Sequence, residues 1–362
     1  MLSRLVTMAC VIAAAGAAAA TFDELAADAA AARRGNRIPE AIALYRQGVE
    51  LRPSWAEGWW FLGTLSYASY QYADCQAAFD RFVKLDDTRA LSWALLGLCE
   101  FETGEYGRAL DHLRQGASGK DLDPDVEAVV RFHYGLLLTR VGSFEQGKRE
   151  LERYARGAAQ EPMLIAGLGL NALQERLLPK EIPAERRAVI VQTGMVMGQW
   201  VLGETDKVET GFRDLLKQHP TVAGLHYLYG IYLSSTRPAD AMVELRRELA
   251  LNPTHADAAA MLALLLLREN DLPDAVPYAR TAATEQPLDA LVEYAYGEVL
   301  AGTGDLRSAI ARLEDAERID PAVLQYHMAL AGAYSQAGRY EDARRERRSS
   351  LQMAAGAQTA RN

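Results

Sequence analysis

The sequence has few of the residues that build reactive or metal-binding sites. It contains three cysteines and six histidines in 362 residues, and no two cysteines have the C-x-x-C spacing of redox and zinc motifs. The histidines are His112, His133, His219, His226, His255 and His327. No two of them lie four residues apart, and there is no H-E-x-x-H segment. Because a metal site needs several ligands to converge, we predict neither a metal nor a cofactor.

The motifs of common enzyme classes are also missing. There is no G-x-S-x-G segment and no phosphate-binding G-x-x-x-x-G-K-[ST] segment. The stretch from Gly167 to Ala172 matches the G-x-G-x-x-A part of a dinucleotide fingerprint, but no strand is predicted before it. We expect its glycines to let two helices pack closely, and we predict that the protein is not an enzyme.

Basic residues are not in surplus, and no segment after residue 20 is long and apolar enough to span a membrane. The 39 Lys and Arg against 48 Asp and Glu give a formal net charge of -9, which argues against nucleic acid as a partner. Residues 1–20 combine a basic start at Arg4, an apolar run and three alanines before Thr21. This pattern predicts a signal peptide and an exported, periplasmic or secreted protein without a membrane span in its mature chain. An uncleaved anchor and lipid attachment at Cys10 are the alternatives.

The two remaining cysteines, Cys75 and Cys99, fall in segments that we expect to form neighbouring helices. An exported protein would permit a disulfide between them. Two buried, unpaired thiols are the alternative, because cysteine is common at small packed positions.

What the chain does contain is a repeated pattern, which is clearest from Ala290 to Val323. Two segments with helical apolar spacing are separated by a break and closed by a proline. The marker residues of this unit are Tyr296, Gly297, Gly304, Asp305, Ala309, Leu313, Ala316 and Pro321. We predict a helical hairpin in which Gly297 and Ala309 let the two backbones approach.

The order and spacing of these residues resemble the tetratricopeptide repeat. The period recurs from Phe22 to about Ala357, with an interruption after the fourth unit. The resemblance implies an all-α fold, a right-handed α-solenoid of about nine helical hairpins with an irregular helix pair in the middle. It implies little about function.

We divide the chain accordingly into a signal peptide (1–20), an N-terminal arm of four repeats (22–161), an irregular helical connector (162–188), a C-terminal arm of five repeats (189–357) and a tail (358–362). The connector is apolar on every side from Met163 to Leu178, which predicts a buried helix that ends before Pro179. The arginines after Ala343 make the last helix polar, as expected for a cap.

In the tetratricopeptide family, fixed positions of each first helix line a concave surface. The resemblance carries these positions onto Trp60, Tyr67, Leu98, Phe101, Phe132, Leu136, Trp200, Tyr227, Ile231, Leu267 and Tyr294. If uncovered, this stripe would expose more apolar surface than soluble monomers usually show. Either a partner covers it, or the chain packs on it. The Lys, Arg and Asn clamp that holds acidic chaperone tails is absent.

The sequence therefore predicts a non-catalytic scaffold of the cell envelope or exterior, which captures a partner polypeptide in an apolar, aromatic groove. A self-assembling structural subunit is one alternative. An accessory protein that threads a glycan over its aromatic rings is another.

Overall fold

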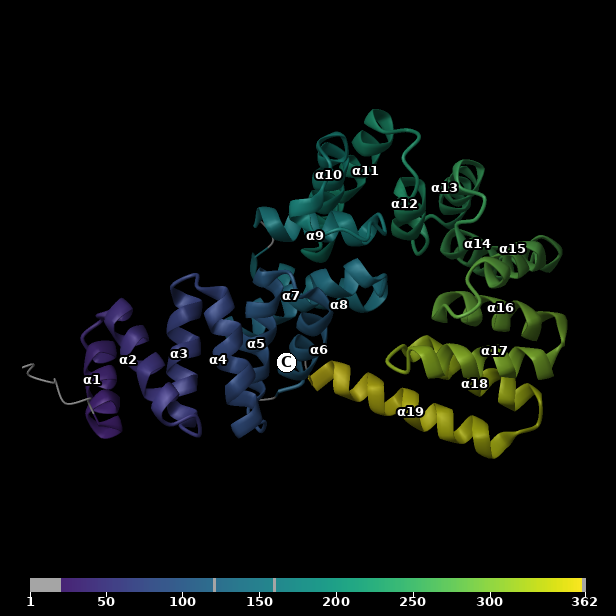
Figure 1. Ribbon diagram of the computed structural model, residues 1–362. Helices are drawn as coiled ribbons and strands as arrows, with labels where there is room; N and C mark the ends of the chain where they lie inside the picture. Colours follow the sequence, from purple (N-terminus) through teal and green to yellow (C-terminus); the bar gives the residue numbers. More distant parts are fainter. Residues whose placement is uncertain (1–20, 120–121, 159–160, 360–362) are drawn as a thin grey trace, which may run out of the picture. The chain divides into compact units, whose positions relative to one another are not determined.

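A computed structural model describes residues 21–119, 122–158 and 161–359. These ranges contain nineteen α-helices and one short 3₁₀ helix, and no strand (Figure 1). The predicted all-α fold of paired helices is thus confirmed. The predicted signal peptide lies outside the described residues. Within the described ranges, no helix is both long and apolar enough to be a membrane span.

The chain divides into two compact units, residues 1–138 (unit 1) and 139–362 (unit 2). Unit 1 holds three complete hairpins, and α7 runs across the boundary. Its helices are α1 (Phe22–Arg34), α2 (Ile38–Leu51), α3 (Ala56–Ala68), α4 (Tyr72–Leu85), α5 (Ala90–Thr103), α6 (Tyr106–Ala117) and most of α7 (Pro124–Val141).

Unit 2 contains the remaining helices, which follow one another around an arc in Figure 1. They are α8 (Phe144–Ala158), α9 (Pro162–Ala172), the 3₁₀ helix η1 (Pro179–Glu181), α10 (Ala184–Val201), α11 (Thr205–Gln218), α12 (Leu225–Leu233), α13 (Pro238–Leu251), α14 (Ala256–Arg268), α15 (Leu272–Glu285), α16 (Ala290–Thr303), α17 (Leu306–Ile319), α18 (Leu324–Gln336) and α19 (Tyr340–Thr359). From α12 onward the helices pack as successive hairpins.

The hairpin α16–α17 shows how the repeat is built. A Cβ atom added to Gly297 would lie 2.7 Å from Leu313 Cγ and 3.2 Å from the Ala309 carbonyl oxygen, so the two backbones are in close contact. Gly304 ends α16 with φ 85°, a left-handed conformation that favours glycine. The small residues predicted at these positions are therefore required by the packing and the turn.

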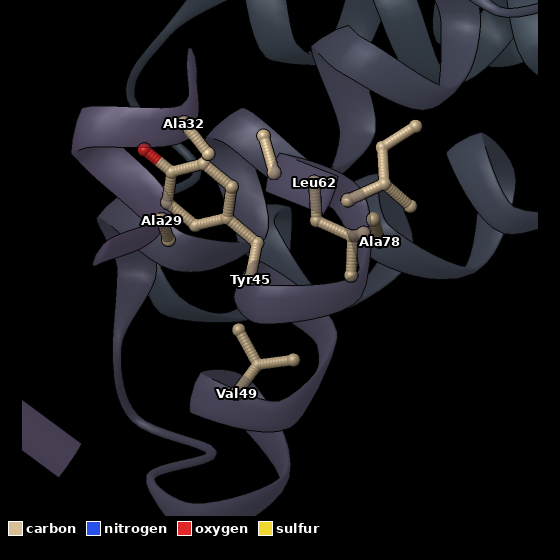
Figure 2. Close-up of a cluster of buried hydrophobic side chains, with 8 residues drawn as sticks. Ala29, Ala32, Tyr45, Val49, Leu62 and Ala78 are labelled. Carbon is tan, nitrogen blue, oxygen red and sulfur yellow. The ribbon is translucent and has the colours of Figure 1, made fainter. Parts of the chain in front are cut away.

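Large rings fill the space between the first helices of unit 1. Figure 2 shows the Tyr45 ring beside Ala29 and Ala32 of α1, in one buried cluster with Leu62 of α3. The Tyr45 hydroxyl accepts a hydrogen bond from Arg33 Nε at 3.2 Å. The ring therefore packs against two hairpins while its polar end keeps a partner.

Cys75 of α4 and Cys99 of α5 are joined in a disulfide, with their Cα atoms 6.0 Å apart. Both side chains are completely buried. Two consecutive hairpins of unit 1 are therefore linked covalently.

The connector contains α9 and η1 rather than one helix up to Leu178. The expected helix ends six residues early, at Ala172, because Gln174 adopts φ 54° and the Glu175 N–H turns back to the Leu170 carbonyl. Apolar character did not reveal this end, since the turn that follows is also buried, with Leu178 only 1% exposed.

Glycines in α9 and α10 permit direct backbone contact, as expected for the sequence around Gly167. A Cβ atom on Gly169 would lie 1.9 Å from the Ile190 carbonyl oxygen, and one on Gly194 would lie 1.8 Å from the Ile165 carbonyl oxygen. No side chain fits at either position, so the backbones of α9 and α10 are in direct contact.

Two other helix starts differ from those that the sequence pattern predicts. The fourth repeat was expected to start near Ala128, but α7 begins at Pro124, where a proline is tolerated because the first helical N–H has no partner. The fifth was expected near Val189, but α10 begins at Ala184. α7 thus begins 34 residues after α5, on the repeat period, whereas α10 begins five residues before the expected position.

Candidate functional site

Unit 1 carries six of the residues predicted to line a groove, and four of them are buried. Leu98, Phe101, Phe132 and Leu136 are between 1% and 6% exposed. The Phe101 ring lies 4.7 Å from the ring of His133, in an edge-to-face arrangement. These four side chains present little surface to a ligand.

Trp60 and Tyr67, the other two, are half-buried on α3. The Trp60 ring lies 5.3 Å from that of Phe82 and 5.7 Å from that of Phe79. Tyr67 lies 5.8 Å from Tyr72, and burial raises the pKa of its hydroxyl. Both residues thus belong partly to the core of their own hairpin.

In unit 2 the predicted residues Trp200, Tyr227 and Ile231 come together. They line one cavity of about 60 Å³, which α8 bounds on the other side with Glu145, Lys148 and Glu152. The inner surface at α10 and α12 is therefore largely covered by α8.

An ion pair fixes α8 within the arc of unit 2. Arg149 Nη1 lies 2.7 Å from Asp320 Oδ2, in the turn between α17 and α18. The other predicted residues, Leu267 and Tyr294, are half-buried and do not line this cavity, and the Tyr294 ring packs on Tyr326 at 5.1 Å.

Carboxylates give the cavity a negative character. Burial and the nearby Asp289 carboxylate raise the pKa of Asp257 to about 6, although Gln174 Nε2 donates a 2.8 Å hydrogen bond to Asp257 Oδ2. Asp257 Oδ1 is buried and has no hydrogen-bond partner within the described part of the chain. Burial raises the pKa of Asp289 as well. The surroundings of Asp257 and Asp289 therefore favour a bound proton or another positive charge.

An open groove lies elsewhere in unit 2, between α10 and α11. It has a volume of about 560 Å³, and Met195, Val196 and Leu215 form its apolar part. Its polar lining consists of Gln192, Gln199, Asp206, Lys207, Thr210, Asp214 and Gln218. Met195 is 49% exposed, so the groove opens to solvent.

This groove was not predicted from the sequence, although the sequence contains a signal for it. The position that holds Gly63, Gly97 and Gly297 in other repeats holds Val196 in the fifth. The small residue lies on the second helix instead, where a Cβ atom on Gly211 would lie 2.5 Å from Val196 Cγ2. Gln192 stands at the position that holds Trp59 and Trp93 in the second and third repeats, so no large ring covers this end of the groove.

Four histidines that seemed scattered pair with buried glutamates. The imidazole-to-carboxylate distances are 2.6 Å for His112 with Glu100, 2.6 Å for His226 with Glu244, 2.9 Å for His255 with Glu248 and 3.0 Å for His327 with Glu346. Among the residues that the structure describes, one group has the chemistry and proximity of metal ligands. The ligand atoms of Glu317, His327 and Glu346 all lie within 4.8 Å of one another.

The family profile described as tetratricopeptide repeat matches residues 62–125, 231–290 and 294–356, just over half of the chain. This chain belongs to the tetratricopeptide repeat family. Proteins of this family mediate protein–protein interactions and are typically non-catalytic. A comparison with curated proteins found no significant match.

Several solved tetratricopeptide repeat structures are similar to this one. MamA has 20% sequence identity, covers 46% of this chain and 97% of its own, and gives a TM-score of 0.37. Yeast Tom70 has 13% sequence identity. The match covers 94% of this chain and 95% of the Tom70 chain, with a TM-score of 0.35. YrrB, described as a TPR protein with an unusual peptide-binding site, has 12% sequence identity. The match covers 76% of this chain and 92% of the YrrB chain, with a TM-score of 0.30.

Proposed function

We propose that this tetratricopeptide repeat protein is an exported, non-catalytic scaffold that captures a partner polypeptide in the groove between α10 and α11. The observation that carries the proposal is the groove itself. Its 560 Å³ volume and apolar part, with exposed Met195, suit the insertion of one or two apolar side chains.

The lining of the groove favours a short amphipathic helix as the occupant. The two antiparallel helices of this hairpin bound a groove along which a third helix can place apolar residues at i, i+3 and i+4. Methionine adapts its shape to such side chains, and the glutamines of the lining can donate and accept hydrogen bonds. Asp206, Lys207 and Asp214 provide charges of both signs for orientation.

The aromatic inner stripe is the competing location for a partner. A ligand that reaches Tyr227 or Trp200 has to displace α8, because residues of α8 line the same cavity. A ligand in the groove between α10 and α11 displaces nothing. We therefore place the first contact in the groove.

Photo-crosslinking in the native host tests this location. A photoreactive residue at Met195 should give one dominant adduct with another protein, identified by mass spectrometry. The same residue at Leu288, which is 77% exposed and outside the groove, serves as the control and should give none. Adducts from probes at Tyr227 or Trp60 but not from Met195 would move the site to the inner stripe. Adducts of the chain with itself would favour a self-assembling structural subunit. Adducts with a glycan would favour an accessory protein that threads a glycan.

A blocking variant tests whether the groove contributes affinity. Thr210 is exposed and lines the groove, so Thr210→Trp should fill it without disturbing the core. We expect capture of the crosslinked partner to fall at least tenfold. Thr284→Trp on α15, also at an exposed threonine, should leave capture unchanged. Equal capture by both variants would contradict the proposed location.

Export is a separate part of the proposal and has its own test. It rests on the basic, apolar and alanine-rich order of residues 1–20. The intact mass of protein recovered from the native host should correspond to a chain that begins at Thr21. A full-length chain found only in the cytoplasm would reject the export of this protein and leave the scaffold proposal to be judged by crosslinking.

A further inference from the structure

Three consecutive helices of unit 2 each contribute one residue to a compact cluster near the end of the chain. Glu317 comes from α17, His327 from α18 and Glu346 from α19. One imidazole nitrogen and one oxygen from each carboxylate lie within 4.8 Å of one another. His327 is 5% exposed and Glu346 is 7% exposed, whereas Glu317 is partly open to solvent.

Hydrogen bonding fixes which nitrogen of His327 faces the carboxylates. Nε2 lies 3.0 Å from the Pro321 carbonyl oxygen, which can only accept, so Nε2 carries a hydrogen and donates it. Nδ1 lies 3.0 Å from Glu346 Oε2. In the neutral imidazole, Nδ1 therefore directs a lone pair at a carboxylate oxygen. A positive species, either a proton or a metal ion, is needed between these two atoms.

The arrangement of Nε2 is the one that metal-binding histidines use. A ligating histidine commonly donates its second ring N–H to a backbone carbonyl, which fixes the tautomer and orients the ring. Here the Pro321 carbonyl has that role. The imidazole is thus held with its free lone pair toward two carboxylates.

The two carboxylates have coordination sites to offer. Glu346 Oε1 accepts from Arg345 Nε at 3.1 Å, while its Oε2 faces His327. No hydrogen bond or ion pair involves the Glu317 carboxylate among the described residues. In a tetrahedral site with bonds of about 2.0–2.2 Å, ligand atoms lie about 3.3 Å apart, so a small rotation of the half-buried Glu317 side chain completes the set.

We propose that Glu317, His327 and Glu346 bind a divalent transition-metal ion of the zinc type. One imidazole nitrogen with two carboxylate oxygens suits zinc, whereas calcium and magnesium prefer oxygen ligands alone. Water occupies the fourth position on the open side, next to Glu317. The ion links α17, α18 and α19, so it joins the last helix to the preceding hairpin.

Isothermal titration of chelator-treated, untagged protein with zinc chloride tests the site. The wild-type chain should bind about one ion per molecule, and its melting temperature should rise when zinc is added. Glu317→Gln should bind zinc at least tenfold more weakly and lose the zinc-dependent rise in melting temperature. Because Glu317 is partly exposed and forms no described hydrogen bond, this variant should fold normally without zinc.

A second histidine pair in unit 2 provides the matched control. His226 Nδ1 lies 2.6 Å from Glu244 Oε2, but no third metal ligand converges on this pair within the described ranges. His226→Gln should therefore leave zinc affinity unchanged, whereas His327→Gln should abolish it. If zinc binding is absent from the wild type, or is the same in Glu317→Gln, the proposal is wrong and His327 holds only a proton.

Discussion

Unit 1 and unit 2 use the same repeat but fill it differently. In unit 1, aromatic rings fill the space between and within hairpins: the Tyr45 and Trp55 centroids are 5.6 Å apart, and Trp60 packs against Phe79 and Phe82 of its own hairpin. In unit 2, alanines bring α14, α15 and α16 close together in a buried cluster. Among the described residues, unit 1 buries one glutamate, Glu100, and unit 2 buries Glu244, Glu248, Glu293 and Glu346.

The difference shows that the repeat backbone does not dictate the chemistry of its core. Apolar packing is insensitive to pH, whereas a buried carboxylate stabilises only while its charge is matched by donors. We therefore expect the two units to respond differently to truncation of a side chain and to acid.

Phe79→Ala should have the largest effect and act on unit 1. Phe79 is fully buried in a cluster with Phe82 of its own hairpin and Leu96 of the next, so its removal leaves a cavity between two hairpins. We expect a loss of about 4 kcal/mol in the free energy of unfolding, equal at pH 5 and pH 8. Urea unfolding followed by tryptophan fluorescence measures it. A loss that depends strongly on pH would remove the contrast between the units.

Glu248→Ala is the corresponding change in unit 2. Burial raises the pKa of this carboxyl, but hydrogen bonds from His255 and the Gly224 N–H outweigh it, and the pKa is lowered overall. Its contribution is therefore complete above the unfolded pKa of about 4.3 and is lost as pH falls through the lower folded value. We expect a loss of about 3 kcal/mol at pH 7 that shrinks in acid. An unchanged loss at pH 3 would show that the charge is irrelevant.

Asp257→Asn should stabilise the protein, in contrast to the two preceding variants. The pKa of Asp257 is raised to about 6, so the folded chain binds a proton that the unfolded chain releases at about 4. Stability therefore falls as pH rises from 4 to 6, and a neutral amide avoids this loss. We expect a gain of about 2 kcal/mol at pH 7 and none below pH 4, measured by thermal melting. A destabilised variant at pH 7 would mean that the carboxylate has a partner.

Gly104→Ala and Gly304→Ala should have the smallest effects, equal in both units. Both glycines end a helix at φ 86° and 85°, and an added Cβ atom would meet nothing within 4 Å. Only the cost of the left-handed conformation remains, about 1 kcal/mol each. Urea unfolding measures the loss in the free energy of unfolding for each variant. Unequal losses would show that the two units also differ in their turns.

The sequence predicted the helical hairpins because small residues, turn glycines and the period are local signals. Gly297, Ala309 and Gly304 each have the role expected of them. The end of α9 was missed, since no glycine or proline marks the turn at Gln174. The site was harder to predict, because α8 covers Tyr227 through contacts between distant repeats, and no periodic pattern encodes them.

The cluster of Glu317, His327 and Glu346 was also beyond the sequence analysis. Its members are ten or more residues apart and lie on three helices, so only the packing of those helices brings them together. The disulfide illustrates the opposite case. Cys75 and Cys99 lie on consecutive helices, and the spacing alone was enough to raise the pairing as one of two possibilities.

The single helix α9 is an odd member in an array of two-helix repeats. In a chain of two-helix repeats, first and second helices alternate, so one extra helix would exchange the inside and the outside of everything after it. The backbone contact of Gly169 with Ile190 takes α9 out of this alternation, and α10 again acts as a first helix. Whole hairpins can be gained or lost on either side without disturbing this order. A deletion that ends within α9 would disturb the order of first and second helices. The position of α9 therefore limits where the array can be lengthened or shortened.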